Sequence, residues 1–338
     1  MSSTDGTLRE SNRNAKKRSA SPSKQEQQGR ESAKRREIRS DYQKVEPNSD
    51  QENMERAYEL DMDILQTELA DDEPDCRFAE SSSFLNYQCT KGNHKDYVPI
   101  DSLFYPTLPE AYEREDIASV VKALGKLVVK IEVNHSSPRR PKLFPGKNAK
   151  FPKGHCRATG KIIFSERKRD FGQEWGEIKI ATSSHVVFDQ SEAEHTTCIL
   201  NFDNADSEVV KLKCTKVTYV NTEQDNCLLI CKTGDMNLVK QLMDNIYDFV
   251  NTHKELHEKY RNLPKNDLVL TVSHPHGHTK QVSIGSYAEP DKNKYHLTTC
   301  KGSSGAPIYR LNQEKVWVLE VHSGSADGLA VSGLQLNK

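Results

Sequence analysis

The sequence predicts an all-β fold of two consecutive six-stranded antiparallel β-barrels, joined by an amphipathic helix and preceded by a disordered N-terminal tail. Three observations lead to this prediction. The first 75 residues are polar and highly charged, twelve short β-like runs follow residue 115, and one helical pattern divides these runs six and six.

The N-terminal tail changes the sign of its charge partway along. Residues 1–45 contain 12 basic and 6 acidic side chains, whereas residues 46–75 contain 12 acidic side chains and a single basic one, Arg56. Residues 1–45 have almost no large apolar residue and cannot bury enough surface to offset the conformational entropy lost on folding. We therefore expect residues 1–75 to be disordered and residues 76–114 to connect them to the folded part.

Two features of the tail predict its location and contacts. Basic clusters at 16–18 and 34–36 are 15 residues apart, a spacing typical of a bipartite nuclear localisation signal, and a solvated basic tail is the competing interpretation. We expect a nuclear protein, with a cytoplasmic location as the alternative. A short amphipathic helix is predicted within MERAYELDMDILQTELA (54–70), so that residues 46–70 would dock on a protein partner or pack on the chain's own domain.

Short runs rich in Val, Ile, Leu and Thr predict the strands, with the first barrel over 115–233 and the second over 265–338. The runs of the first barrel are KLVVKIEV (126–133), ATGKIIF (158–164), GEIKIATSS (176–184), TTCILNF (196–202), EVVKLKCTKVTYV (208–220) and NCLLICK (226–232). The runs of the second barrel are DLVLTVS (267–273), KQVSIGSYA (280–288), KYHLTT (294–299), APIYR (306–310), KVWVLEVHS (315–323) and GLAVSGL (328–334).

Between the barrels, residues 234–264 follow a helical pattern. Apolar residues recur at three- and four-residue steps from Leu238 to Tyr260, and Pro264 ends the pattern. This predicts a long amphipathic helix that links the two barrels.

Composition argues against several classes of protein. No apolar run approaches the roughly 20 residues that span a bilayer, and the N-terminus lacks the hydrophobic stretch of a signal peptide. The eight cysteines form no C-x-x-C pair, so neither a zinc ribbon nor a thioredoxin-like motif is indicated. We expect an intracellular protein without membrane contact, cofactor or metal, and interpret His274, His276 and His278 in SHPHGH as part of a turn.

Three short motifs predict chemistry. A serine hydroxyl becomes a nucleophile only with a histidine base, a carboxylate that orients the base, and N–H donors for the oxyanion. IATSSHVVFD supplies His185 at the end of a predicted strand, EQDNCLLIC supplies Asp225 at the start of another, and GSSGAP supplies Ser304 in a glycine-bounded turn. A purely structural turn is the competing interpretation of GSSGAP. An α/β-hydrolase elbow fits poorly, because Ala306 stands where that motif has glycine.

The three motifs together resemble those of trypsin-like, chymotrypsin-fold serine proteases of the intracellular type without disulfides, over residues of about 115–338. The resemblance implies a serine endopeptidase in which Ser304 attacks the scissile carbonyl, His185 transfers the proton and Asp225 orients His185. It also implies that the backbone N–H groups of Gly302 and Ser304 form the oxyanion hole.

Several positions depart from the secreted members of that family. Ser303 stands where they carry the aspartate that pairs with a new N-terminus after zymogen cleavage. Cys300 matches one of their half-cystines, but no cysteine follows it, and Val186 stands where another half-cystine would be. We therefore expect the fold to hold without the usual disulfides.

The resemblance also implies a substrate pocket. Thr299 and His322 match positions that line the primary pocket of glutamyl endopeptidases and picornaviral processing proteases, and both can hydrogen-bond a carboxylate or carboxamide. This suggests cleavage after Glu or Gln, although related intracellular trypsin-like proteases also carry a histidine in this region without a clear acidic preference. By the same resemblance Ser323 would support Asp225, and the backbone of 323–325, ending at Ser325, would pair with a peptide substrate.

Two other functions are weighed against a protease. The barrels could be a catalytically silent interaction scaffold, recruited through the charged tail, in which Ser303 leaves the oxyanion hole unformed. Nucleic-acid binding rests only on the basic tail and the basic loop at 134–155, and is the weakest hypothesis.

Overall fold

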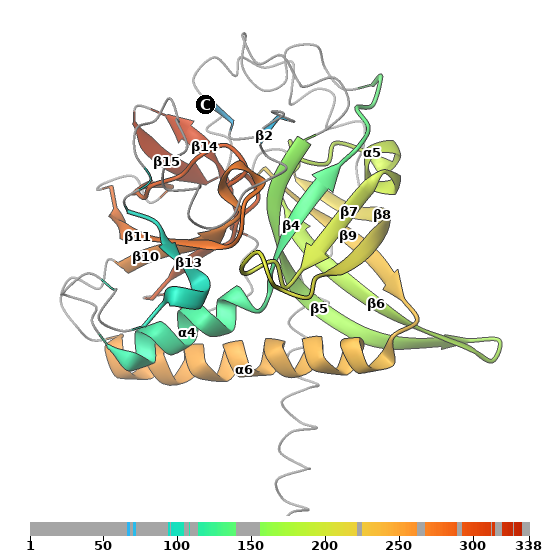
Figure 1. Cartoon of the computed structure of the whole chain (residues 1–338), viewed down its shortest axis with the longest axis horizontal. Helices are drawn as coiled ribbons and strands as arrows, with labels where there is room; N and C mark the ends of the chain where they lie inside the picture. The colour runs from blue at the N-terminus through green and yellow to red at the C-terminus, as the bar shows by residue number, and fades with distance from the viewer. Residues whose placement is uncertain are drawn as a thin grey trace, which may run out of the picture. The chain divides into compact units, whose positions relative to one another are not determined.

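The computed structural model describes the two sheets and the helices that pack on them (Figure 1). The described residues are 66–67, 70–71, 94, 96–104, 108, 114–139, 156–221, 225–261, 268–288, 293–311, 313–314, 320–326 and 328–332. The two basic clusters of the tail, most of the predicted helix at 54–70 and the basic loop beyond residue 139 lie outside these residues, so those predictions stay predictions.

The first sheet closes into a barrel. Its strands pair antiparallel in the order β2-β5-β4-β7-β8-β9-β6, and β6 pairs again with β5. Val, Ile and Leu side chains of these strands fill the interior, and Ile131, Ile162 and Ile180 are fully buried. The strands are β2 (Ala70–Asp71), β4 (Val128–Val133), β5 (Cys156–Asp170), β6 (Gln173–Thr182), β7 (Thr196–Leu200), β8 (Val210–Asn221) and β9 (Asn226–Thr233).

The second sheet is built from shorter strands. They run in the order β1-β14-β15-β12-β11-β10-β13, with β3 paired to β11, and the bridge between Pro307 and Val321 brings β13 back to β14. The strands are β1 (Gln66–Thr67), β3 (Val98–Pro99), β10 (Leu268–Ser273), β11 (Gln281–Tyr287), β12 (Lys294–His296), β13 (Ile308–Arg310), β14 (His322–Ala326) and β15 (Leu329–Ser332).

These pairings confirm the predicted all-β fold of two antiparallel barrels. Six strands of each sheet come from the predicted runs, and short strands from before residue 100 add to both sheets. The described end of the stretch predicted to be helical, 66–67 and Ala70, is extended. Its backbone pairs with β14 and β5 rather than with itself.

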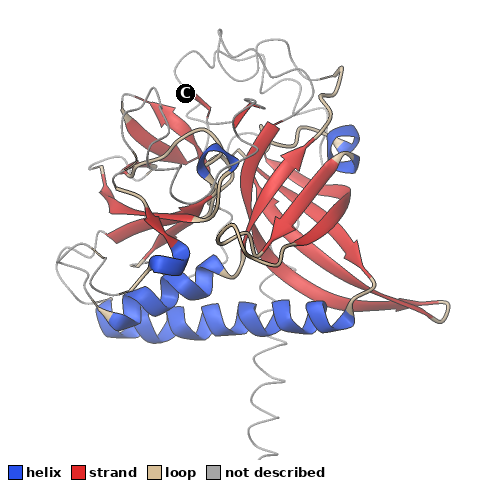
Figure 2. Ribbon diagram, viewed as in Figure 1, coloured by secondary structure: helices blue, strands red, loops and turns tan. Residues whose placement is uncertain are grey.

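The predicted linker helix is α6 (Met236–Tyr260), which runs below both sheets in Figure 2. Asp235 caps its N-terminus, because its side chain accepts hydrogen bonds from the N–H groups of Asn237 and Leu238. The helix contacts the first barrel, where Ser165 donates to the Val239 carbonyl. It also contacts the second barrel through His253 on Tyr309, described below.

A second helix, α4 (Glu115–Gly125), was not predicted from the sequence and packs on α6 (Figure 2). Its buried residues Ile117, Val120, Val121 and Leu124 follow helical spacing, and only Gly125 and Lys126 separate Leu124 from the apolar run that contains β4. Periodicity alone could not separate the helix from the strand.

The remaining helical segments are short. They are η2 (Ile100–Ser102), α5 (Gln190–Glu194) and η5 (Pro275–Gly277), and η5 confirms that SHPHGH forms a turn. Among the helices of the described residues, none is both long and apolar enough to cross a membrane.

Candidate active site

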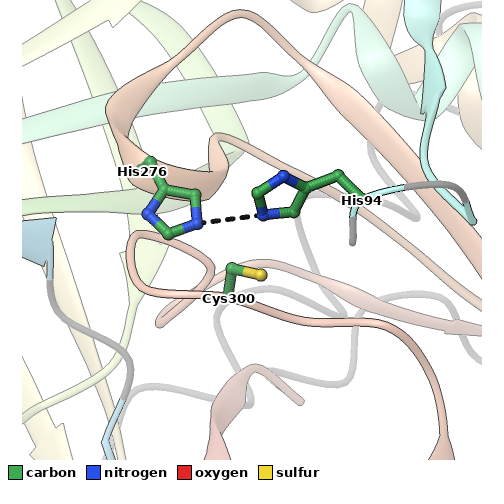
Figure 3. A group of neighbouring side chains, drawn as sticks. All are labelled: His94, His276 and Cys300. Carbon is green, nitrogen blue, oxygen red and sulfur yellow. Dashed lines mark hydrogen bonds between the residues drawn. The ribbon is translucent and has the colours of Figure 1, made fainter. Parts of the chain in front are cut away.

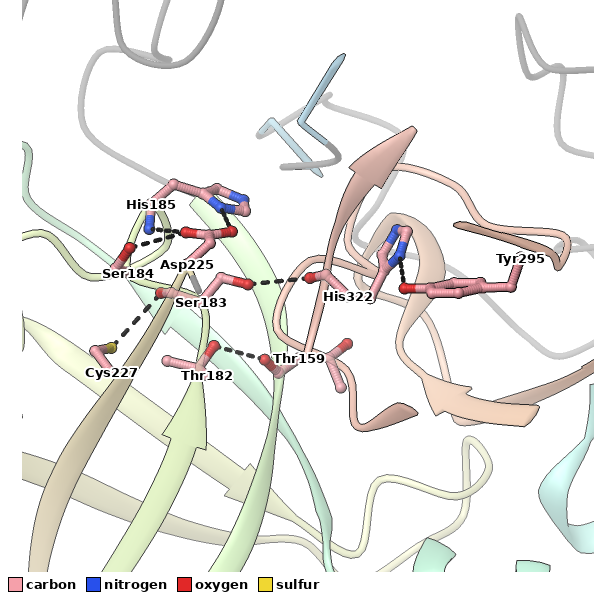
Figure 4. Close-up of polar contacts among 9 residues, drawn as sticks. All are labelled: Thr159, Thr182, Ser183, Ser184, His185, Asp225, Cys227, Tyr295 and His322. Atoms are coloured by element: carbon pink, nitrogen blue, oxygen red, sulfur yellow. Dashed lines mark hydrogen bonds and ion pairs between the residues drawn. The ribbon is translucent and has the colours of Figure 1, made fainter. Parts of the chain in front are cut away.

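His185 and Asp225 are brought together by the pairing of β6 with β9. His185 lies in the turn that follows β6, and Asp225 immediately precedes β9. Since Thr182 pairs with Cys227 at these strand ends, the two turns must lie side by side. His185 Nδ1 lies 2.6 Å from Asp225 Oδ2, and both side chains are fully buried (Figure 4). This contact can fix the imidazole tautomer.

The other oxygen of Asp225 is also held. Asp225 Oδ1 accepts hydrogen bonds from Ser184 Oγ at 2.8 Å and from the His185 N–H at 3.1 Å. The backbone of Asp225 has φ of 48°, a left-handed conformation that aspartate tolerates better than most residues. Ser184 was not among the predicted site residues, although it directly precedes His185 in the SSH motif.

The turn that carries Ser304 packs against the strand end that leads to His185. Gly305 has φ of 82°, and a Cβ there would collide with Thr182 Oγ1 and the Thr159 carbonyl oxygen. Only glycine fits such a close approach. The second barrel therefore presents Ser304, which is fully buried, beside the segment of the first barrel that carries His185.

Thr159 of β5 makes the main hydrogen bonds between the two barrels at this site. Its N–H donates to the Ser304 carbonyl at 2.9 Å, and its hydroxyl donates to the Gly302 carbonyl at 2.8 Å. The same hydroxyl accepts from the His274 N–H at 3.0 Å, while the Thr159 carbonyl accepts from Thr182 Oγ1 at 2.8 Å. Thr159 was not predicted as a site residue, because nothing local in ATGKIIF distinguishes it.

Gly302, which the resemblance predicts to be an oxyanion-hole residue, has a left-handed backbone conformation. Its φ is 92°, and a Cβ there would lie 2.5 Å from the His274 carbonyl oxygen and 2.8 Å from the His276 nitrogen. A larger residue would push the turn away from the neighbouring η5 loop.

Ser303 has local partners. Its hydroxyl lies 3.2 Å from Ser273 Oγ, and it accepts from the Cys300 N–H at 3.3 Å, while the Ser303 N–H donates to the Cys300 carbonyl at 2.9 Å. The side chain is fully buried. These contacts tie the turn to β10, at the position where the secreted proteases that the motifs resemble carry an aspartate.

The predicted pocket residues lie around β14. His322 is fully buried, its Nδ1 lies 3.3 Å from Tyr295 Oη, and its carbonyl accepts from Ser183 Oγ at 3.0 Å (Figure 4). Thr299 is also buried. Tyr295 was not predicted as a site residue, because in the run KYHLTT it looks like an ordinary aromatic residue of a strand.

Ser323 lies at an irregularity in β14. The register with β15 shifts between His322 and Gly324, so Ser323 occupies a bulge, a device that redirects a side chain. It is fully buried. Ser325 follows, largely buried, and continues the pairing with β15.

The edge of β14 is paired with the N-terminal segment. Gln66 of β1 lies opposite Ser325, and Thr67 lies opposite Gly324, in antiparallel register. This is the backbone that the resemblance assigns to the peptide substrate. The chain's own strand therefore occupies that edge (Figure 4).

Comparisons with known proteins yield structural neighbours only. No protein-family model matches the chain, and no curated protein sequence matches it. One similar solved structure is Deg5, with 13% identity, a TM-score of 0.37, and coverage of 67% of this chain and 91% of Deg5. Another is an HtrA-type protease, AlgW, with a tripeptide, with 11% identity, a TM-score of 0.35, and coverage of 64% of this chain and 59% of AlgW.

The strand pairings of the chain itself establish the architecture. Two antiparallel barrels meet where the motifs of His185, Asp225 and Ser304 lie.

Proposed function

We propose that the protein is a serine endopeptidase that uses Ser304, His185 and Asp225. The observation that carries the proposal is the buried contact of His185 Nδ1 with Asp225 Oδ2, at the strand ends against which the Ser304 turn packs. A histidine so oriented presents its Nε2 as a base.

The proposed reaction is acyl transfer in two halves. Ser304 Oγ attacks the scissile carbonyl carbon while His185 Nε2 takes the hydroxyl proton, and the N–H groups of Gly302 and Ser304 stabilise the oxyanion. The tetrahedral intermediate collapses, the C–N bond breaks, and the imidazolium gives its proton to the leaving amine. Water then repeats the sequence on the acyl-enzyme, releasing the acid and restoring Ser304.

The proposed pocket selects Glu or Gln at the cleaved bond. If Tyr295 donates its hydroxyl proton to His322 Nδ1, the proton of the neutral imidazole lies on Nε2, which can then donate to a carboxylate or amide oxygen. A peptide-library digest tests this, with His322→Ala and Tyr295→Phe as paired variants. Cleavage after aromatic or basic residues in the wild type would contradict the roles of Thr299 and His322.

We propose further that substrate pairs with β14 in place of β1. Extended peptides commonly bind proteins by adding a strand to an exposed sheet edge. Because β1 already occupies Gly324 and Ser325, it must leave before a substrate can pair there. The N-terminal segment would thus lower the activity of the full chain.

The test of the catalytic proposal is labelling of the full-length protein with a fluorophosphonate. We expect labelling of the wild type and of Ser119→Ala, a serine on the exposed side of α4, and its loss in Ser304→Ala and His185→Ala. A folded wild type that stays unlabelled, also when β1 is disrupted, would favour the silent scaffold. Labelling that persists in Ser304→Ala would place the nucleophile elsewhere.

A further inference from the structure

Three side chains that commonly bind metals converge beside the proposed active site. His94, His276 and Cys300 come from three separate segments and are 1%, 4% and 2% exposed (Figure 3). One ligating atom of each lies within 4.8 Å of those of the other two, and the Nε2 atoms of the two histidines are 3.2 Å apart.

We propose that His94, His276 and Cys300 bind one Zn²⁺ ion. Two imidazole nitrogens and one thiolate form a donor set that zinc accepts, with a fourth position left for water or another ligand. Two Zn–N bonds of about 2.05 Å at a tetrahedral angle place the nitrogens about 3.3 Å apart. The observed 3.2 Å between Nε2 atoms matches that spacing.

The backbone of His276 supports a built site. His276 has φ of 54° and ψ of 18° inside η5, although it is not a glycine. A left-handed conformation costs such a residue about 1–2 kcal/mol, and residues held in this way cluster at functional sites. The His276 N–H donates to the Lys301 carbonyl, so the strained turn lies directly against the loop that leads to Ser304.

The ion would cross-link segments that are far apart in the chain. His94 lies between β2 and β3, His276 lies between β10 and β11, and Cys300 starts the loop of Gly302 and Ser304. No disulfide joins the described cysteines to one another. Cys300 matches a half-cystine of secreted proteases, and a zinc bond to its thiolate would provide a cross-link at that position without a disulfide.

Zinc binding would stabilise the loop from Cys300 to Ser304, which carries the proposed oxyanion-hole N–H groups. The Ser303 N–H donates to the Cys300 carbonyl, the Cys300 N–H donates to Ser303 Oγ, and Gly302 lies against His274 and His276. Zinc held by Cys300 and His276 would fix both sides of this contact. The thiol releases its proton to solvent on binding, because the thiolate is the ligand.

The competing interpretation is a buried histidine pair. In that case an N–H of one imidazole donates to the other, and His94 packs on Tyr97 with ring centroids 5.9 Å apart, without any metal. The zinc site predicts stoichiometric metal binding with a thiolate ligand, whereas the histidine pair predicts neither.

The experiment measures zinc in the full-length protein by elemental analysis, and Co²⁺ in its place by absorption spectroscopy. We expect about one zinc ion per chain and, with Co²⁺, tetrahedral d–d bands together with a thiolate charge-transfer band. Cys300→Ser should abolish the charge-transfer band. His94→Gln, which changes a residue outside both barrels, should weaken zinc binding by about 100-fold or more.

Cys214→Ser is the matched control, because Cys214 is also buried but lies in β8 of the first barrel. It should keep the zinc and the cobalt spectrum. The proposal is overturned if the wild type binds neither metal, if cobalt binds without the charge-transfer band, or if both ligand variants keep wild-type affinity. If Cys300→Ser fails to fold, the presence or absence of the charge-transfer band in the wild-type cobalt spectrum still tests whether a thiolate binds the ion.

Discussion

The two barrels position their halves of the proposed site in different ways. The first barrel has long strands, with 15 residues in β5 and 12 in β8, and places His185 and Asp225 at the ends of two directly paired strands. The second barrel has three-residue strands β12 and β13, and carries Ser304 in a turn between strands.

Because of this difference, backbone pairing holds one half of the proposed site, and single side chains hold the other half. The backbone ladder of β6 and β9 holds the His185–Asp225 pair. The Ser304 turn is held by hydrogen bonds to Thr159 and by glycines that permit close approach. We therefore expect the serine half of the site to be more sensitive to conservative changes outside the triad.

The largest loss of activity is expected from a change in the His185–Asp225 pair of the first barrel. Asp225→Asn should lower kcat by about 10⁴-fold, because the amide stabilises the wrong imidazole tautomer while preserving the shape of the site. Peptide hydrolysis measures the effect, and Asp206→Asn, an exposed aspartate of the same barrel, should be neutral. Near-normal turnover in Asp225→Asn would remove this residue from the mechanism.

The next effect tests the contact between the barrels. Thr159→Val removes the hydroxyl that bonds Gly302 and His274, and a loss of about 1–3 kcal/mol in transition-state stabilisation corresponds to a rate about 5- to 150-fold lower. Thr271→Val is the matched control, since its buried hydroxyl bonds Pro307 within the second barrel. Equal losses of activity in both variants would show that only general stability had changed.

A smaller effect, a gain in activity, is expected when the pairing of β1 is disrupted. Replacing Gln66→Pro and Thr67→Pro together in the full chain removes two N–H donors and should break the pairing of β1 with β14. If displacing β1 costs a substrate about 1 kcal/mol, removing this cost should raise kcat/KM for a peptide about five-fold. The control is Gln27→Pro with Gln28→Pro in the tail. Unchanged or lower activity in the β1 variant would argue against competition with substrate.

The smallest effect concerns how the second barrel is anchored on α6. His253 Nδ1 lies 2.9 Å from Tyr309 Oη, and burial lowers the pKa of His253 to about 4, below its ordinary value of about 6.5. Between these pH values the unfolded chain binds a proton that the folded chain does not. The free energy of unfolding should therefore fall as the pH is lowered from about 6.5 to about 4.

His253→Gln should flatten this dependence while retaining a polar side chain near Tyr309. Urea denaturation at several pH values measures it. Identical slopes in wild type and variant would mean that other groups, such as the buried His278, with a pKa also lowered to about 4 by burial and by nearby Lys130, account for the loss.

The sequence by itself determined the features that depend on local pattern. Short runs rich in Val, Ile, Leu and Thr predicted the strands, and a helical apolar period predicted α6, because burial of one helix face imposes a period on its residues. The motifs around His185, Asp225 and Ser304 were visible because a reactive turn needs particular residues next to one another.

Only the tertiary structure decided the features that join distant parts of the chain. The pairing of β1 with β14, the hydrogen bonds of Thr159 to the Ser304 turn, and the cluster of His94, His276 and Cys300 each link segments more than 100 residues apart. The residues concerned look ordinary in their own surroundings. Their roles arise from the closure of the second sheet and its packing on the first, which no local period encodes.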